Sequence, residues 1–128
     1  FGVGNIGSAL VGYKEFTRQG FMITKLFDND QRKIGSNHKG IVISDIRNMK
    51  QEVTEAGIEM AIIAVPATVA QCIVEDLVGM GISGFLNFAP ISLKVPKDAY
   101  VRNEKMAMEL EYLSFAMVNK HTQKKPRS

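Results

Sequence analysis

A glycine motif at the start of the chain is the strongest chemical signal in the sequence. The pattern G-x-G-x-x-G is met by Gly2, Val3, Gly4, Asn5, Ile6 and Gly7. In such a motif the first glycine permits a tight turn, the second lets a pyrophosphate approach the backbone, and the third lets a helix pack closely on its strand. The N-terminus of that helix offers free N–H groups to phosphates. The motif predicts a dinucleotide site, although a plain glycine-rich turn would also satisfy it.

Asp28 is the acidic residue expected to complete that site. It follows Gly7 by 21 residues and ends an apolar run that reads as a strand. A carboxylate at this point can bond the adenosine ribose and repel a 2′-phosphate, so we expect NADH and NAD+ to be preferred over NADP(H). Arg32 could accept a 2′-phosphate, which keeps NADP(H) open. Lys33 is either a ribose or phosphate contact or an ordinary solvated lysine.

Two further candidate segments follow apolar strands. They are Val65, Pro66 and Ala67 at the end of the first of these strands, and Asn87, Phe88, Ala89 and Pro90 at the end of the second. Ligands of doubly wound sheets bind at the carboxyl ends of strands, so we expect both segments to line the cofactor pocket. The alternative is that the prolines only terminate their strands.

Groups that could perform chemistry are scarce. A single cysteine, Cys72, excludes a disulfide framework and a multi-cysteine metal site, and we expect it to be a packing residue. His38 and His121 are isolated in a loop and a tail, without an evident carboxylate partner. We therefore predict no catalytic residue, no metal site and no enzyme activity in this chain.

The elements that must position these residues alternate between helix and strand. Helices are expected over 5–18, from a cap at Ser44 or Asp45 to residue 56, over 68–80 and over 104–118; strands over 21–28, 41–43, 59–65, 82–88 and 100–101, with a loop over 29–39. This alternation predicts an α/β fold, a Rossmann-like doubly wound parallel sheet with helices on both faces. The strand that should precede Gly2 is missing from this chain, and we expect it in upstream sequence.

The last predicted helix is apolar on several faces. One stripe contains Met106, Leu110, Leu113 and Met117, while Phe115 lies on another face. A surface helix would show only one stripe, so this helix must be buried on several sides. We expect it to be a dimerisation helix.

Composition limits the remaining possibilities. The chain has 128 residues, of which 45% are hydrophobic and 23% charged, which fits one folded domain and excludes wholesale disorder. No apolar stretch approaches the roughly 20 residues of a membrane span. Four positive charges lie within the last nine residues, so the net charge of +3 belongs to a tail and is weak evidence for nucleic-acid binding. We expect a cytoplasmic protein without membrane contact.

Four motifs together resemble the redox-sensing transcriptional repressor family Rex. They are Gly-Val-Gly-Asn-Ile-Gly-Ser-Ala-Leu at 2–10, Phe-Asp-Asn-Asp-Gln-Arg-Lys-Ile-Gly at 27–35, Ala-Val-Pro-Ala-Thr-Val-Ala-Gln at 64–71 and Leu-Asn-Phe-Ala-Pro at 86–90. In that family an N-terminal winged-helix domain, which is not present in this chain, binds operator DNA. NADH binding to the C-terminal domain releases the DNA, and two subunits exchange their C-terminal helices.

The resemblance implies a division of the chain and a set of roles. It implies an NAD(H)-binding domain over 1–102, an exchanged dimerisation helix over 103–119 and a basic disordered tail over 120–128. The glycine motif would cradle the pyrophosphate, Asp28 would hold the adenosine ribose, and Pro66, Ala67, Phe88, Ala89 and Pro90 would line the path to nicotinamide. Lys105 stands where the family has an aspartate that couples cofactor state to DNA binding, which leaves the family's switch in doubt here.

Two other functions stay open on the sequence. The chain could be the cofactor domain of an NAD-dependent oxidoreductase, or a CoA-binding domain of the acyl-CoA ligase type.

Overall fold

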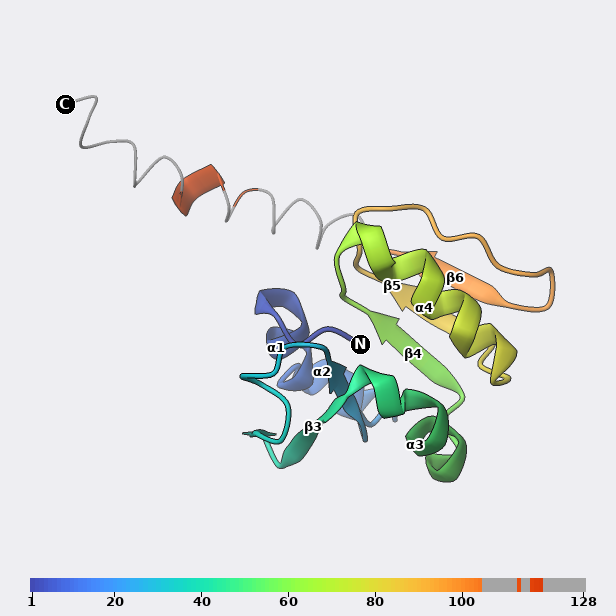
Figure 1. The fold of residues 1–128 in the computed structure, drawn as a ribbon. Coiled ribbons are helices and arrows are strands. Elements are labelled where there is room, and N and C mark those ends of the chain that lie inside the picture. Colours follow the sequence, from blue (N-terminus) through green and yellow to red (C-terminus); the bar gives the residue numbers. More distant parts are fainter. Residues whose placement is uncertain (105–112, 114–115, 119–128) are drawn as a thin grey trace.

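Two three-stranded sheets make up the centre of the computed structural model, which describes residues 1–104, 113 and 116–118 (Figure 1). Their strand orders are β1-β3-β2, from β1 (Leu26–Asp28), β2 (Asn37–His38) and β3 (Ile41–Asp45), and β4-β5-β6, from β4 (Met60–Ile63), β5 (Gly84–Asn87) and β6 (Tyr100–Asn103). All neighbouring strands run parallel except β2, which is antiparallel to β3. The predicted α/β class with parallel strands is confirmed.

Helices connect these strands. They are α1 (Asn5–Val11), α2 (Lys14–Arg18), a short 3-10 turn η1 (Ile46–Asn48) leading into α3 (Met49–Ala56), and α4 (Ala67–Gly79). Figure 1 draws α3 and α4 on the near side of the strands and α1 and α2 farther back. Of the two predicted caps it is Asp45 that begins the 46–56 segment, since its carboxylate accepts the Arg47 N–H at 2.9 Å. Gly57 ends α3 in the left-handed conformation.

The prediction of one helix over 5–18 was wrong, because the helix breaks after Val11. The N–H groups of Gly12 and Tyr13 bond to the carbonyls of Ala9 and Leu10, which closes two overlapping four-residue turns. Tyr13 is then extended, with ψ of 108°, before α2 begins. Glycine is a poor residue for a helix interior, and its place here lets the chain turn.

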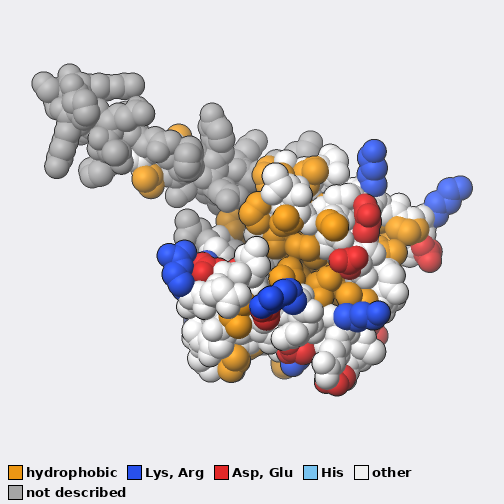
Figure 2. Space-filling view, in the orientation of Figure 1, with side chains coloured by type: hydrophobic (Ala, Val, Ile, Leu, Met, Phe, Trp, Pro, Cys, Tyr) orange, Lys and Arg blue, Asp and Glu red, His pale blue; other side chains and the backbone are white. Residues whose placement is uncertain are grey.

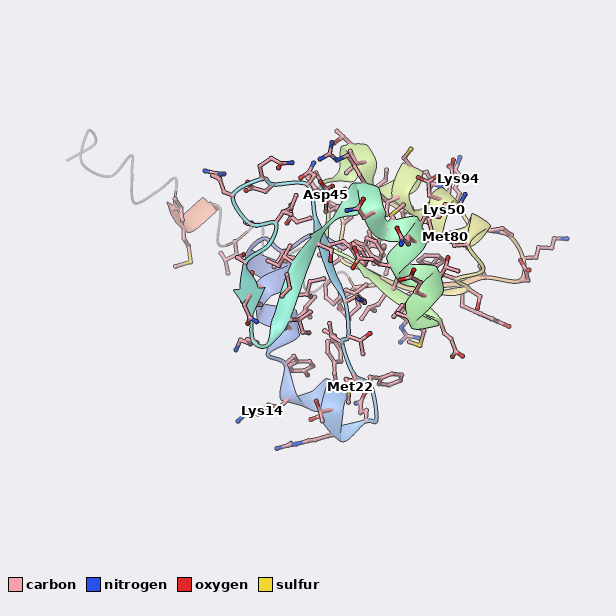
Figure 3. The ribbon with its side chains drawn as sticks, turned by 60° about the horizontal axis from the view of Figure 1, so that its bottom comes forward. Lys14, Met22, Asp45, Lys50, Met80 and Lys94 are labelled. Atoms are coloured by element: carbon pink, nitrogen blue, oxygen red, sulfur yellow. The ribbon has the colours of Figure 1, made fainter. Side chains whose placement is uncertain are left out.

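The first predicted strand is also shorter than expected. Pairing to β3 begins only at Leu26, opposite Ile43, so residues 21–25 form no ladder. Met22 lies beside α2 with Lys14 at one end of the molecule (Figure 3) and is 80% exposed. An apolar composition was therefore not enough to make a strand where no partner strand runs alongside.

The segment 29–39, which was predicted to be a loop, contains β2, and β2 forms a small hairpin with β3. Asn37 pairs with Val42 and His38 with Ile41, and Lys39 and Gly40 make the turn with φ values of 51° and 88°. Positive φ at both central residues is the geometry that suits a two-residue hairpin. The Asn37 side chain accepts the Gly40 N–H at 2.9 Å, which holds the turn.

The two sheets meet along a seam occupied by Phe1 and Gly2. The Phe1 amine donates to the Ile62 carbonyl at 2.9 Å, and the Phe1 carbonyl accepts the Ala64 N–H at 2.8 Å. On the other side, Gly2 N–H donates to the Phe27 carbonyl at 2.9 Å, and the rings of Phe1 and Phe27 stack at 4.9 Å. These two residues lie where the sequence predicts the end of the sheet's first strand.

A cavity of about 850 Å³ continues the seam between β1 and β4. It is lined mainly by apolar groups, among them Leu10, Phe16, Ile23, Val53, Ile58 and Phe85. Figure 2 shows apolar side chains gathered in the middle of one face with charged side chains around them. The cavity therefore lies between the two sheets, on the side where the chain begins its glycine turn.

The core is divided between the two sheets. The larger cluster spans β4, β5, α3 and α4 and reaches Phe27 of β1, while a small cluster of Val3, Leu26 and Ile43 serves the first sheet. Within the described residues, no helix combines the length and the apolar character needed to cross a bilayer.

Candidate nucleotide-binding site

The glycine motif forms the turn from the seam into α1, and its three glycines have distinct surroundings. Gly2 has φ of +94°, and a Cβ there would lie 2.5 Å from the Ala64 carbonyl oxygen. A Cβ on Gly7 would overlap the carbonyl oxygen of Gly2. Gly4, the residue preceding α1, has open space around it. Two glycines thus allow close packing, and the third leaves the backbone accessible in front of the helix N-terminus, as a phosphate site requires.

Two distant residues hold the peptide of Val3 from both sides. The Asp28 carboxylate accepts the Val3 N–H at 2.8 Å, and the Lys33 ammonium donates to the Val3 carbonyl at 2.8 Å. Val3 itself is buried. The structure therefore brings the glycine motif and Asp28 together, and it places Lys33, whose role the sequence left open, at the same turn. It adds that both charged residues shape the glycine turn.

Asp28 keeps capacity for a further partner. Its Oδ2 accepts the Val3 N–H and its Oδ1 accepts the Asp30 N–H at 2.9 Å. A carboxylate offers about four lone-pair positions, and Asp28 is only half-buried. The same carboxylate can thus accept a ribose hydroxyl while it holds the turn.

Arg32 is already paired. Its guanidinium donates to both carboxylate oxygens of Asp30 at 3.2 Å, and the Arg32 side chain is 90% exposed. Hydrogen bonds from Arg32 hold the pKa of Asp30 below its ordinary value. This pairing leaves Arg32 turned toward its own loop, which disfavours the 2′-phosphate role.

The other candidate segments follow β4 and β5 at the same edge. Val65 is buried, Pro66 caps α4, and Ala67 is the first residue of that helix. The Phe88 N–H donates to the Ile63 carbonyl at 2.7 Å, which places the segment after β5 directly beside the end of β4.

The segment after β5 contributes backbone more than side chains. Phe88 and Ala89 are both buried, so their side chains belong to the core, while Pro90 is exposed. Of the two explanations given for these prolines, neither is decided by this geometry.

Asn87 opens the second candidate segment in the sequence, but its part in holding that segment was not predicted. It is 1% exposed and is the only buried polar residue among those that the structure describes. Its amide bonds to Ala89, Ile91 and Asn103, all of which follow β5 in the chain. The available signal was a single asparagine inside the apolar run that ends in Phe88, Ala89 and Pro90, because a buried amide must find partners.

The described part of the chain offers no cluster for catalysis by metal. No group of three or more His, Cys, Asp or Glu residues within it could hold an ion. Cys72 is exposed, so its predicted packing role was wrong. His38 approaches the Ser8 carbonyl at 3.2 Å through Nε2, which joins β2 to α1.

The predicted dimerisation helix lies mostly outside the described residues. Among its named residues, Lys105, Met106, Leu110 and Phe115 are not described, and neither is the side chain of Asn5 in the glycine motif. Leu113 and Met117 are described, are helical, and are 55% and 61% exposed.

Comparison with known proteins gives consistent results. Residues 1–91 match the family model described as the CoA binding domain. Sequences named redox-sensing transcriptional repressor Rex are similar: the protein from Desulforamulus reducens is 43% identical over 93% of this chain and 57% of its own length, and that from Clostridium perfringens is 44% identical over 88% and 54%. The chain thus spans about half the length of these curated relatives.

Solved structures show the same likeness. The crystal structure of RSP, a Rex-family repressor, has a TM-score of 0.80 at 29% identity, over 99% of this chain and 61% of that one. RSP in complex with β-NADH has a TM-score of 0.79 at 30% identity, over 97% and 60%. RSP in complex with β-NAD+ and operator DNA has a TM-score of 0.79 at 29% identity, over 98% and 58%.

Proposed function

Because this chain belongs to the CoA-binding domain family, in the form that Rex redox-sensing repressors carry, we propose that it binds NADH and NAD+ and reports their balance. The observation that carries this proposal is the convergence of Asp28 and Lys33 on the glycine turn, at 2.8 Å each. The free N–H groups at the start of α1 would bind the pyrophosphate, and Asp28 the adenosine ribose. Lys33 would complete the cradle with a positive charge.

The nicotinamide end would lie along the segments after β4 and β5. Val65, Pro66 and Ala67 and then Phe88, Ala89 and Pro90 follow strands whose carboxyl ends are adjacent to the glycine turn. Ligands of such sheets bind where the strand order reverses, which here is the seam between β1 and β4. The fit of the site to a dinucleotide rests on this chain's own turn, carboxylate and helix N-terminus.

The proposed role is regulatory and involves no bond-making chemistry. Residues 1–102 would sense the cofactor, 103–119 would dimerise, and 120–128 would be a basic tail. Operator DNA would be bound by a winged-helix domain outside this chain, in a protein of the cytoplasm. Cofactor state can affect DNA binding only if NADH and NAD+ have different affinities for the two arrangements of the dimer.

Dimerisation through an exchanged C-terminal helix is supported by two exposed apolar side chains. Leu113 and Met117 are four residues apart, so they lie on one helix face. We expect light scattering at micromolar concentration to give a dimer, and the double variant Leu113→Lys, Met117→Lys to give a monomer. Val42→Lys, at a residue 54% exposed on β3, is the matched control and should stay dimeric. A monomeric parent protein would contradict this proposal.

Titration with four ligands tests the function. We expect NADH and NAD+ to bind and NADPH to bind more weakly, because Asp28 repels a 2′-phosphate. CoA binding is the second candidate, and the family model matched by residues 1–91 favours it. Tighter binding of CoA than of NADH would overturn the proposal. The cofactor domain of an oxidoreductase would require an acid and a base outside this chain.

A further inference from the structure

Asn87 connects the segment after β5 to the start of the C-terminal segment. Its Nδ2 donates to the Ile91 carbonyl at 2.7 Å and to Asn103 Oδ1 at 2.8 Å, and its Oδ1 accepts the Ala89 N–H at 2.9 Å. Its backbone carbonyl accepts the Glu104 N–H at 2.9 Å. One buried residue therefore fixes both ends of the 88–91 turn and the point where the chain leaves β6.

The bonding capacity of this amide is fully used on the donor side. A primary amide has two N–H donors, and one goes to Ile91 and the other to Asn103. If the Asn103 side chain is removed, one donor of the buried amide loses its partner, and the amide is held by two hydrogen bonds instead of three. The bonds to Ile91 and Ala89 would then loosen together, because all three share one planar group.

We propose that Asn87 is a positioning residue for the nicotinamide end of the cofactor, and that Asn103, at the start of the C-terminal segment, holds Asn87 in its working orientation. This inference rests on the proposed function, since the turn it positions is the one assigned to nicotinamide. It adds that the chain leading into the predicted dimerisation helix takes part in binding. Cofactor occupancy and the C-terminal segment would be coupled through one hydrogen bond, and such coupling is reciprocal.

Variants at Asn103 test the proposal because this residue is exposed, so a change there spares the core. Asn103→Ala removes the acceptor, whereas Asn103→Asp keeps an oxygen acceptor in the same place. In the full-length protein we expect Asn103→Ala to weaken NADH binding about tenfold, as the loss of a buried hydrogen bond would. ADP, which is held by the glycine turn and Asp28, should bind within about twofold of the parent protein. Asn103→Asp should match the parent for both ligands.

Comparing the affinities for NADH and ADP distinguishes a positioning role of Asn103 from a general loss of structure. A parallel loss of NADH and ADP affinity in Asn103→Ala would show a merely structural role and overturn the inference, and so would unchanged NADH affinity. If the parent protein binds ADP and NADH equally, the proposed function fails instead.

A second measurement needs no ligand. Amide hydrogen exchange at Ala89 should be faster in ligand-free Asn103→Ala and unchanged in Asn103→Asp, because only the first loosens the amide that accepts the Ala89 N–H. Unchanged exchange in both variants would overturn the inference independently of NADH binding.

Discussion

Replacing Gly7 by alanine is expected to lower NADH affinity by about 100-fold or more, the largest single effect that the structure predicts. A Cβ at this position would overlap the carbonyl oxygen of Gly2 and lie 2.9 Å from its carbonyl carbon. Both atoms belong to the backbone, and the backbone of Ala64 lies directly against Gly2. Neither the Gly2 peptide nor the start of α1 can therefore shift without a loss of folding stability. Overpacking of this kind costs up to about 3 kcal/mol of folding stability. If the turn moves to relieve the overlap, its N–H groups no longer face the pyrophosphate, and a loss of about 2.7 kcal/mol of binding free energy corresponds to the 100-fold change in affinity. Fluorescence titration with NADH and urea unfolding measure the two consequences.

Two other glycines of the chain provide controls for that result. Gly79→Ala lies at the end of α4 in open space, so it should leave NADH binding unchanged and raise helix stability slightly. Gly4→Ala also meets nothing in the fold, so it should leave stability nearly unchanged and weaken NADH binding, because the pyrophosphate approaches there. Equal NADH affinity in Gly7→Ala and the parent would show that the turn is not the phosphate site.

The second large effect is expected for Asp28→Ala. This change removes the acceptor of the Val3 N–H and the Asp30 N–H together with the proposed ribose contact. Hydrogen bonds to a charged group are worth about 1.5–3 kcal/mol each, so NADH affinity should fall by about 100-fold. Removing the negative charge should weaken NADPH binding less than NADH binding. The ratio of NADH affinity to NADPH affinity should therefore decrease. Parallel titrations with both nucleotides measure this change.

Asp30→Ala is the matched control for that variant. Asp30 is an acid in the same loop. Among the residues that the structure describes, its carboxylate bonds to Arg32 alone, and the Arg32 side chain is almost fully exposed. We expect its NADH affinity to stay within about twofold of the parent, as is usual for surface pairs. A loss of affinity in Asp30→Ala equal to that in Asp28→Ala would mean that general loop charge, and not the Asp28 contact, determines binding.

The order of elements was predictable from the sequence because local patterns determine it. Gly57 and Gly81, both with positive φ, end their helices where expected, and the run from Glu59 to Val65 contains β4. Asp28 was found by spacing alone, since a strand of ordinary length puts it at the sheet edge. These signals depend on neighbours in sequence, or on a period that a helix or strand imposes.

The features that were missed depend on contacts between distant residues. The short β1 follows from which partner strand runs alongside, and the apolar run from Phe21 to Phe27 does not contain that information. The break at Gly12 is the exception, because the glycine itself was a local signal. Lys33 was left open between a phosphate contact and a solvated lysine, and its bond to Val3 spans 30 residues. The role of Asn87 depends on Asn103, on a strand that pairs with its own only in three dimensions.

The unequal division of the core has a consequence for how the domain opens. The sheet that carries Asp28 has a cluster of only three buried residues, whereas β4 and β5 belong to the much larger one. Regions with few buried apolar contacts open at lower free energy than the global transition. Amide protons of β3 should therefore exchange before those of β5 in the free protein. The adenosine-binding half would then open locally at a lower free energy than the half built on β4 and β5. Bound cofactor would raise that local opening free energy, so the two sheets would become more equal in local stability.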